Sequence, residues 1–408
     1  MAIAKQRFVY VTKNLQNHRL TKLYGFSIYV NMKQHYDILL VGAGLFNATL
    51  SYHFVKSGKS VLVIDKRNHI AGNCYDEPGY GGDMVHQYGA HIFHTSNKEV
   101  WDFVNKFTTF NNYINTPIAN YNNEIYNLPF NMNTFSKMFN VSTPAEAKKI
   151  INREIEKANI KEPKNLEEQA IKMVGTTIYE KLIKGYTEKQ WGKSCRELSP
   201  DIIKRLPLRF TYNNNYFNDK YQGIPEEGYT KMIEKMFEGA DILLNADFMK
   251  DKEYYESLAD KVYYSGCIDE YYEYRFGTLE YRGLRFESHL MTSPSQLQGV
   301  AVMNFTDSTK KYTRRIQHWY FNQDRLDKLL ADDKYLFRGT ETFEYPEDWK
   351  VGDIPYYPIN NARNAELYNK YKSLKNDKVE FVGRLGQYKY FDMDDTIEAA
   401  LKIIKEGV

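Results

Sequence analysis

The chain of 408 residues contains few cysteines, no strong excess of charge and no long apolar run. Its three cysteines, Cys74, Cys195 and Cys267, form neither a CxxC pair nor a regular framework, so a disulfide-stapled fold is excluded and a reducing, cytoplasmic location is expected. The net charge of +3 is too small for a nucleic-acid-binding surface. Because no apolar run reaches membrane-spanning length, no membrane insertion is expected.

Residues 1–31 lack acidic side chains, and they also lack the apolar segment of a signal peptide, because basic residues interrupt each apolar stretch. Met32 stands just before the first expected strand. We therefore interpret residues 1–31 as a disordered extension or an upstream start, without a role in the fold. An organellar transit peptide is the alternative.

A metal-ligand cluster is also missing from the sequence. His91 and His94 have a spacing that on a helix suits a metal, but Gly89 and the β-branched neighbours favour a strand or loop, where the two rings point to opposite faces. No further partner stands at ligand spacing, so no metal is expected.

What is present is an ordinary globular composition, 42% apolar and 26% charged, in a chain longer than one core usually supports. Two or three subdomains are therefore expected. Tyrosine is abundant, with 35 residues against 4 tryptophans, but the base composition of an AT-rich genome explains this. Only tyrosines inside a motif carry weight.

The first expected strands have the pattern of the phosphate-binding half of a dinucleotide fold. A strand over Asp37–Val41 leads into a glycine turn and a helix, and a second strand over Ser60–Ile64 ends in an acid. Gly42 permits the tight turn, and Gly44 leaves room for a pyrophosphate at the helix N-terminus, whose free N–H groups and dipole favour an anion. Asp65 is placed to accept hydrogen bonds from a ribose.

Asn47 occupies the third glycine position of this pattern. A glycine there normally lets the helix pack closely on the strand. Asn47 therefore implies either a looser contact between helix and sheet or a polar contact made by its amide, and the sequence leaves both open.

The middle of the chain changes to helical spacing. Apolar residues at every fourth position predict one helix over 166–183 that ends at Gly185. Pro200 and Pro207 preclude a long helix further on. We therefore expect an irregular, mobile segment near 200–215 that closes over a ligand.

Strand patterns return in the second half of the chain. Residues 223–266 are typical of a helix and strands that rejoin the nucleotide sheet, and residues 267–350 alternate at strand period, which predicts an antiparallel sheet. A strand, a second glycine turn and a helix that begins near Asp394 or Asp395 follow. A glycine turn at this place is typical of flavin proteins.

These patterns predict an α/β fold with a Rossmann-like FAD-binding domain, an inserted helical subdomain and an antiparallel β-sheet subdomain. The FAD-binding domain is expected to combine residues 32–100, 223–266 and 351–408. The helical subdomain is expected over 101–222, and the sheet that binds substrate over 267–350.

Sequence runs along the whole chain resemble the motifs of one family, in that family's order. Among them are VGAGLF, IDKRNHIAGN, YGAHIFHT, IKGYTEKQWG, IIKRLPLRFTYNNNYF, NFTD, YTR, YPEDWKVGDIPYYP and GRLGQYKYFDMD. Together they resemble the bacterial UDP-galactopyranose mutases from about Tyr36 to about Leu401. Asn47 and Ala71 depart from the pattern, since the family usually has glycine there, and both changes bear on flavin affinity and not on the class of reaction.

The resemblance implies a flavin-dependent isomerase that interconverts UDP-galactopyranose and UDP-galactofuranose and supplies galactofuranose for cell-surface polysaccharide. In that family reduced FAD attacks the anomeric carbon through N5, so the reduced cofactor is the active form and a reductant such as NAD(P)H is expected. A homodimer is also expected. Whether UDP-N-acetylgalactosamine is accepted stays open.

Residue by residue, the resemblance implies three groups of site residues. The catalytic group contains Arg205 and Arg314, which resemble the pair that grips the diphosphate, and His91, which resembles a histidine near the flavin. The residues expected at the substrate are Trp191, Tyr216, Arg282, Glu344, Tyr357, Tyr390 and Asp392. The residues expected at FAD are Gly42, Gly44, Leu45, Phe46, Asp65, Lys66, Asn73, Arg384 and Met393.

Two other classes of function share parts of this pattern. A flavin oxidoreductase of the amine-oxidase type has the same nucleotide fold, which fold alone does not exclude. A non-catalytic protein that binds nucleotide sugars would keep the arginines without needing the flavin turns. The YTR and PYYP runs favour a nucleotide-sugar ligand.

Overall fold

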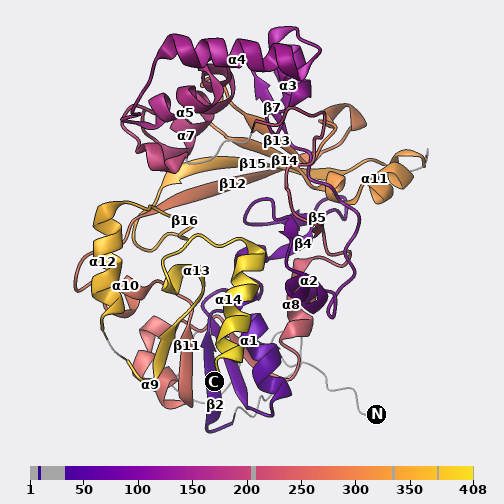
Figure 1. Ribbon diagram of the computed structural model, residues 1–408. Coiled ribbons are helices and arrows are strands. Elements are labelled where there is room, and N and C mark those ends of the chain that lie inside the picture. Colours follow the sequence, from indigo (N-terminus) through magenta and orange to yellow (C-terminus); the bar gives the residue numbers. More distant parts are fainter. Residues whose placement is uncertain (1–7, 11–32, 204–207, 333–335, 375, 408) are drawn as a thin grey trace.

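A computed structural model describes residues 8–10, 33–203, 208–332, 336–374 and 376–407. Its parallel sheet lies at one end, an antiparallel sheet crosses the middle, and a group of helices covers the far end (Figure 1). Residues 204–207, with Arg205, lie outside the described residues. The expected closure of the segment near 200–215 therefore stays a prediction.

Six strands of the described residues form the parallel sheet, in the order β1-β10-β3-β2-β11-β17. Successive side chains of β2 pack on opposite faces: Ile38 and Leu40 join one core cluster, Leu39 and Val41 the other. A parallel sheet buried on both faces requires such a continuous apolar run. The strands are β1 (Phe8–Tyr10), β2 (Tyr36–Val41), β3 (Val61–Asp65), β10 (Asp241–Leu244), β11 (Ala259–Tyr264) and β17 (Val379–Phe381).

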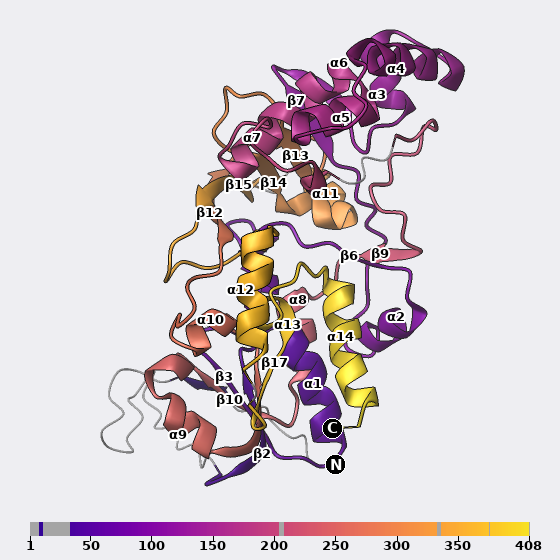
Figure 2. The same cartoon turned by 60° about the vertical axis from the view of Figure 1, so that its left-hand side comes forward.

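Helices cover both faces of this sheet. On one face, α1 and α14 lie side by side, as Figure 2 shows, and α8 and α2 contribute to the same core. On the other face, short helices bury Phe248, Tyr255 and Tyr271. The helices are α1 (Leu45–Lys56), α2 (Lys98–Val104), α8 (Tyr229–Met236), η4 (Phe248–Lys250), α9 (Lys252–Ser257), α10 (Ile268–Tyr271) and α14 (Met393–Lys405).

Two details of this half differ from expectation. Strand β1 pairs with β10 in parallel, so part of residues 1–31 does contribute to the sheet. The expectation of no role for residues 1–31 was wrong in this respect, because a strand of three residues has no sequence pattern that would reveal it. Helix α14 begins at Met393, slightly earlier than expected, with Asp392 as its N-cap residue.

The second sheet has seven strands in the order β16-β12-β15-β14-β13-β7-β8 among the described residues. All neighbours are antiparallel except β13 and β7. The sheet was expected over 267–350, but β7 and β8 come from the stretch expected to be helical. The strands are β7 (Ile118–Tyr121), β8 (Glu124–Asn127), β12 (Tyr281–Met291), β13 (Val302–Phe305), β14 (Arg314–Gln317), β15 (Gly339–Asp348) and β16 (Tyr357–Pro358).

The helix expected over 166–183 is interrupted. Gly175, with φ of +83°, separates α5 from α6. A π-helical turn then leads into α7. The expected helix was to end at Gly185, whereas in the structure α7 begins at this residue. A Cβ at Gly185 would lie 2.4 Å from the carbonyl oxygen of Thr306, so glycine is needed for close contact with the sheet. The helices are α3 (Met132–Phe139), α4 (Pro144–Ala158), α5 (Leu166–Val174), α6 (Thr176–Ile178), η2 (Tyr179–Lys184) and α7 (Gly185–Trp191).

These helices share a core with β7 and β8, through Ala119 and Tyr126. None of the described helices is long and apolar enough to cross a membrane. The other elements are η1 (Gly72–Cys74), β4 (Asp76–Pro78), β5 (Met84–His86), β6 (Phe93–Thr95), η3 (Pro200–Ile202), β9 (Tyr221–Gly223), η5 (Pro294–Gln296), η6 (His318–Asn322), α11 (Gln323–Leu330), α12 (Ala362–Lys372) and α13 (Gly383–Gly386).

Candidate functional site

A cavity of about 680 Å³ lies between the two sheets. The carboxyl ends of β2, β3 and β11 form its floor, and residues of β14, β15 and β16 reach it from the antiparallel sheet. Ligands of open α/β sheets bind at this edge, and the volume is in the usual range of ligand sites, about 300–1,000 Å³.

Two glycine turns form one end of the cavity. Gly42 has φ of +100°, and a Cβ there would lie 2.2 Å from the Ser265 hydroxyl oxygen. A Cβ at Gly72 would lie 3.1 Å from the Cα of Gly44, so the two turns touch without side chains between them. No side chain caps the N-terminus of α1 in the described chain, and Leu45 lines the cavity there. This geometry suits a diphosphate.

Asp65 braces this turn as well as lining the cavity. Its carboxylate accepts the Ala43 N–H at 2.7 Å and the Arg67 N–H at 2.8 Å. Both bonds fix the end of β3 relative to the glycine turn. The role of Asp65 at a ribose stays a prediction.

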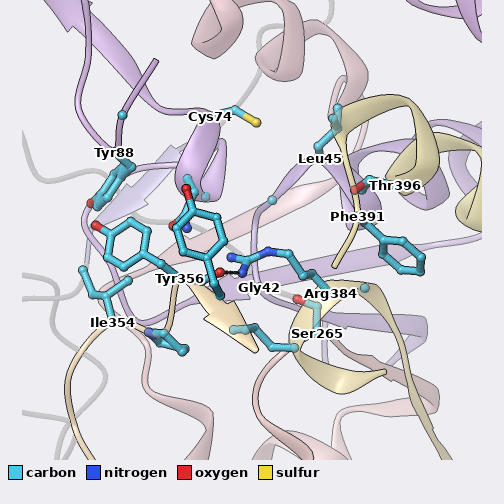
Figure 3. A pocket seen from close by; sticks show the side chains of 18 of the residues that line it. Gly42, Leu45, Cys74, Tyr88, Ser265, Ile354, Tyr356, Arg384, Phe391 and Thr396 are labelled. Atoms are coloured by element: carbon cyan, nitrogen blue, oxygen red, sulfur yellow. Dashed lines mark hydrogen bonds between the residues drawn. The ribbon is translucent and has the colours of Figure 1, made fainter. Parts of the chain in front are cut away.

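Arg384 and Arg67 place two guanidinium groups in the cavity, and neither forms an ion pair with a described residue. Arg384 donates to the Tyr356 carbonyl oxygen, as Figure 3 shows, and burial lowers the pKa of Arg384. The Nη1 atom of Arg67 is buried without a hydrogen-bond partner, while Nη2 donates to Asn73 at 3.0 Å. Partly buried cations without an ion-pair partner fit the diphosphate of a dinucleotide such as FAD.

Arg314 forms a second anion-binding group with Glu344 and Tyr186. Arg314 lies directly opposite Glu344 across β14 and β15, and its Nε lies 3.5 Å from the carboxylate and donates to the Tyr186 hydroxyl at 3.0 Å. Burial alone would lower the pKa of Arg314, but the charge of Glu344 and the neighbouring Tyr186 and Tyr357 raise it well above its ordinary value. The guanidinium is therefore held as a cation with its Nε already engaged.

Glu344 is 1% exposed, and its Oε2 has no hydrogen-bond partner among the described residues. Such an oxygen in a cavity wall suits a ligand hydroxyl or N–H. Burial raises the pKa of the neighbouring Tyr357 to about 12, so this phenol keeps its proton and can donate it to a ligand oxygen.

His91 lines the cavity as a neutral ring. Its Nδ1 lies 2.8 Å from the Gly89 carbonyl oxygen, which can only accept, so the proton is on Nδ1. Burial lowers the pKa of His91 to about 4. At neutral pH Nε2 therefore carries a lone pair and can accept a hydrogen bond or a proton.

The rim of the cavity is aromatic. Tyr390 stacks on Tyr357 with ring centroids 6.1 Å apart, Tyr216 also lines the cavity, and both Tyr390 and Tyr216 are exposed. Burial raises the pKa of Asp392, which contacts Tyr390. An aromatic rim with one acid suits a polar ligand such as a sugar.

Most of the residues expected at the site line this single cavity. They are Gly42, Gly44, Leu45, Phe46, Asp65, Lys66, Asn73, His91, Tyr216, Arg314, Glu344, Tyr357, Arg384, Tyr390, Asp392 and Met393. Their roles toward a ligand stay predictions. Arg205 lies outside the described residues.

Trp191 and Arg282, expected at the substrate, do not line the cavity. Trp191 is the last residue of α7 and packs against the core of the helices. Arg282 donates from Nε to the Gln190 carbonyl at 2.9 Å and pairs with Asp348. It therefore binds the C-terminal end of α7, where a cation is favourable.

Several cavity residues were missed from the sequence. Tyr186 and Asn304 stand inside the runs IKGYTEKQWG and NFTD, so the motif context could have found them. No sequence motif marks Asn115 or Ser265 as a site residue, because only the tertiary structure brings them to the cavity.

Among the described residues, no group of three or more histidine, cysteine, aspartate or glutamate side chains is placed to hold a metal ion. His94 instead lies 2.8 Å from Asp219 and stacks on Phe217.

Comparison with known proteins gives a consistent result. A family model described as UDP-galactopyranose mutase matches residues 181–390, and one described as an NAD(P)-binding Rossmann-like domain matches residues 40–107. A probable UDP-galactopyranose mutase of Klebsiella pneumoniae is 40% identical over 91% of this chain and 94% of its own. A dTDP-fucopyranose mutase of Escherichia coli is 37% identical over 90% and 96%.

Solved structures share the fold. A crystal structure of reduced UDP-galactopyranose mutase matches with a TM-score of 0.66 and 14% identity, over 91% of this chain and 93% of the other. A putrescine oxidase matches with a TM-score of 0.54 and 11% identity, over 91% and 98%. At these identities the matches show the architecture only.

Proposed function

Since the chain belongs to the UDP-galactopyranose mutase family, we propose that it isomerises a nucleotide-linked hexose between its pyranose and furanose forms, with UDP-galactopyranose and UDP-galactofuranose as the pair. The observation that carries the proposal is that one cavity joins a dinucleotide cradle to the cluster of Arg314, Glu344 and Tyr186. An isomerase that uses a cofactor and expels a nucleoside diphosphate needs both parts side by side.

We propose FAD in its reduced form as the cofactor, with its diphosphate between the two glycine turns and beside Arg384 and Arg67. When bound and reduced, FAD would supply the nucleophile, N5, for the anomeric carbon. The unpaired guanidinium groups support this assignment, and so do the turns at Gly42 and Gly72, where the backbone packs too closely for a side chain. A non-catalytic sugar-nucleotide-binding protein would need neither these two guanidinium groups nor these glycine turns.

The protein's own groups have three tasks in this reaction. Arg314 holds the leaving diphosphate, because Tyr186 and Glu344 engage Nε and leave the two terminal nitrogens for phosphate oxygens. Tyr357 donates a hydrogen bond from its protonated phenol. The lone pair on His91 Nε2 accepts a hydrogen bond or proton from the reacting groups.

dTDP-fucopyranose is the second candidate substrate, because the relative that carries this name is almost as similar to the chain as the galactopyranose mutase. The two sugars differ at the 6-hydroxyl, which fucose lacks. UDP-N-acetylgalactosamine is a further substrate to test. The amine-oxidase-like oxidoreductase is supported only by a shared fold.

The decisive experiment is anaerobic incubation of the FAD-loaded protein with UDP-galactofuranose and, separately, with dTDP-fucofuranose, with and without dithionite. We expect conversion to the pyranose only after reduction, and the ratio of the two kcat/KM values identifies the substrate. A protein that binds FAD, is reduced and converts neither compound would contradict the proposal. Net oxidation of either sugar would favour an oxidoreductase.

We also propose a homodimer, reduction by NAD(P)H and a cytoplasmic location. The three cysteines are buried free thiols, which is in keeping with a reducing compartment. Light scattering at increasing concentration tests the dimer. Anaerobic bleaching of the flavin absorbance by NADH or NADPH tests the reductant.

A further inference from the structure

The backbone of His91 is held from both sides by buried side chains. Its N–H donates to Nδ1 of His86 at 3.1 Å, and its carbonyl oxygen accepts from the Tyr229 hydroxyl at 3.1 Å. His86 is 2% exposed and Tyr229 is fully buried. The peptide groups on both sides of the His91 Cα are therefore fixed by groups that do not line the cavity themselves.

The direction of these hydrogen bonds determines where the protons are. A backbone N–H can only donate, so Nδ1 of His86 must carry a lone pair and its proton is on Nε2. His318 repeats the pattern one step further from the cavity: its Nδ1 accepts the His86 N–H at 3.4 Å, and its Nε2 then donates to the Thr342 hydroxyl at 3.0 Å. Three neutral rings in succession thus have defined tautomers.

The surroundings keep His86 in this state. Its ring stacks on Phe321 at 4.6 Å and meets the Tyr229 ring edge-on at 5.5 Å. Burial lowers the pKa of His86 well below its ordinary value, with His318 and His91 adding to the effect. A protonated His86 would lose its acceptor and leave the His91 N–H buried and unpaired.

We propose that His86 is a positioning residue for His91. By accepting the His91 backbone N–H, His86 fixes the turn from Gly89 to His91. The protonated Nδ1 of His91 then keeps donating to the Gly89 carbonyl oxygen, which leaves Nε2 as the acceptor in the cavity. His86 acts through His91 and does not itself touch a ligand. The effect on turnover rests on the proposed function, whereas the tautomer of His91 does not.

The test compares substitutions that keep or move the acceptor. In His86→Asn the amide oxygen can occupy the place of Nδ1, whereas in His86→Gln the amide lies one bond further out and in His86→Leu the acceptor is gone. Histidine-selective ¹⁵N NMR of the apoprotein reports the tautomer of His91. The signals of His91 are assigned as those that disappear in the His91→Gln variant. We expect the Nδ1–H tautomer in wild type and His86→Asn, and a mixture in His86→Gln and His86→Leu.

Kinetics of the reduced, FAD-loaded protein form the second readout. Loss of one hydrogen bond of ordinary strength corresponds to roughly a fivefold fall in kcat, which we expect for His86→Gln and His86→Leu, with KM changed less and with recovery in His86→Asn. Phe321→Leu is the matched control, because it removes the stacked ring but no hydrogen bond. It should lower stability and leave the His91 tautomer unchanged.

The outcomes of these experiments distinguish the positioning role of His86 from the proposed function. An unchanged His91 tautomer and an unchanged kcat in His86→Gln would overturn the positioning role. If His86→Leu does not fold, the pair His86→Asn and His86→Gln decides alone. A tautomer that changes as expected in a protein without mutase activity would contradict the proposed function and support the role of His86.

Discussion

At the scale of single residues, Asn47 shows how an exception in a motif is accommodated. Its amide donates to the carbonyl oxygens of Val41 at 3.0 Å and Gly42 at 2.8 Å, and the side chain is fully buried. Of the two interpretations that the sequence left open, the structure shows the polar contact. The amide ties α1 to the turn that Gly42 makes.

We therefore expect Asn47→Gly to weaken FAD binding, opposite to the tightening that a loosely packed helix would predict. Losing hydrogen bonds worth about 1 kcal/mol corresponds to roughly a fivefold rise in Kd. Asn47→Asp should be worse, because a carboxylate faces two carbonyl oxygens. Titration of the apoprotein by flavin fluorescence measures both.

The matched control is Asn364→Gly. Asn364 is also fully buried near a helix N-terminus and donates to the Ile359 carbonyl at 2.8 Å, but it does not line the cavity. This variant should lose stability and keep its FAD affinity. Tighter FAD binding by Asn47→Gly would show that the amide contact has no part in shaping the turn.

Arg314 is the second residue whose role can be measured. Under the proposed role of Arg314 at the leaving diphosphate, Arg314→Ala should lower kcat by roughly 10²–10³-fold, the cost of about 3–4 kcal/mol in transition-state stabilisation. Arg314→Lys should recover only part, since an ammonium cannot reproduce the guanidinium fork. Steady-state rates of the reduced enzyme at saturating substrate give the answer.

The neighbouring Arg315 is the control for Arg314. It pairs with Glu341 and does not line the cavity. Arg315→Ala should keep kcat within a few-fold. Near-normal turnover by Arg314→Ala would show that Arg314 is a structural arginine.

At the scale of elements, local patterns were predictable and elements that depend on distant partners were not. The order of β2, glycine turn, α1 and β3 followed from adjacent residues. Strands β7 and β8 were missed because β7 is stabilised by pairing with β13, far along the chain. The continuation of the helical path through Gly185 was missed because a glycine usually ends a helix, whereas this glycine admits the close approach of Thr306.

The same distinction applies to the site. Residues inside motifs, such as Arg314 and Arg384, line the cavity as expected. Arg282 lies outside the cavity lining, because its side chain turns to the carbonyl end of α7, and a motif position does not reveal that direction. Its role toward a substrate stays a prediction. Ser265 contributes through the fold alone.

The turn before η1 gives a prediction at this scale. Ala71 has φ of +72°, a left-handed conformation that costs a non-glycine residue about 1 kcal/mol, and its N–H donates to Ala43 at 2.8 Å. Ala71→Gly should therefore raise the free energy of unfolding by about 0.5–1 kcal/mol. Urea denaturation with an unchanged m-value measures it.

Ala48→Gly provides the opposite control. Ala48 lies inside α1, where glycine costs about 1 kcal/mol, so this variant should be less stable than wild type. If Ala71→Gly is destabilised as much as Ala48→Gly, the strain assigned to Ala71 is absent.

At the scale of the whole molecule, the buried histidines make stability depend on pH. Burial holds the pKa of His86 well below its ordinary value and lowers the pKa of His318 to about 3. An unfolded histidine binds its proton near pH 6.5, so unfolding takes up protons between that pH and the lowered values. Stability is therefore complete above about pH 6.5 and falls on acidification.

For the three buried histidines His86, His91 and His318, the free energy of unfolding should fall by up to about 4 kcal/mol per pH unit below pH 6. Urea denaturation at pH 7, 6 and 5 measures the slope. His318→Gln should reduce the slope by about a third. Equal stability at pH 7 and pH 5 would contradict the neutral state of the three rings.

The topology of the parallel sheet also determines when its core can be fully packed during synthesis of the chain. Strand β3 ends at Asp65, yet its neighbour β10 begins at Asp241, and α14, which packs on α1, ends at Lys405. While the ribosome makes the residues between them, one edge of β3 has no partner and the apolar face of α1 is uncovered. A nascent chain that stops early would expose both, so proteases and chaperones would remove truncated products before they could sequester FAD.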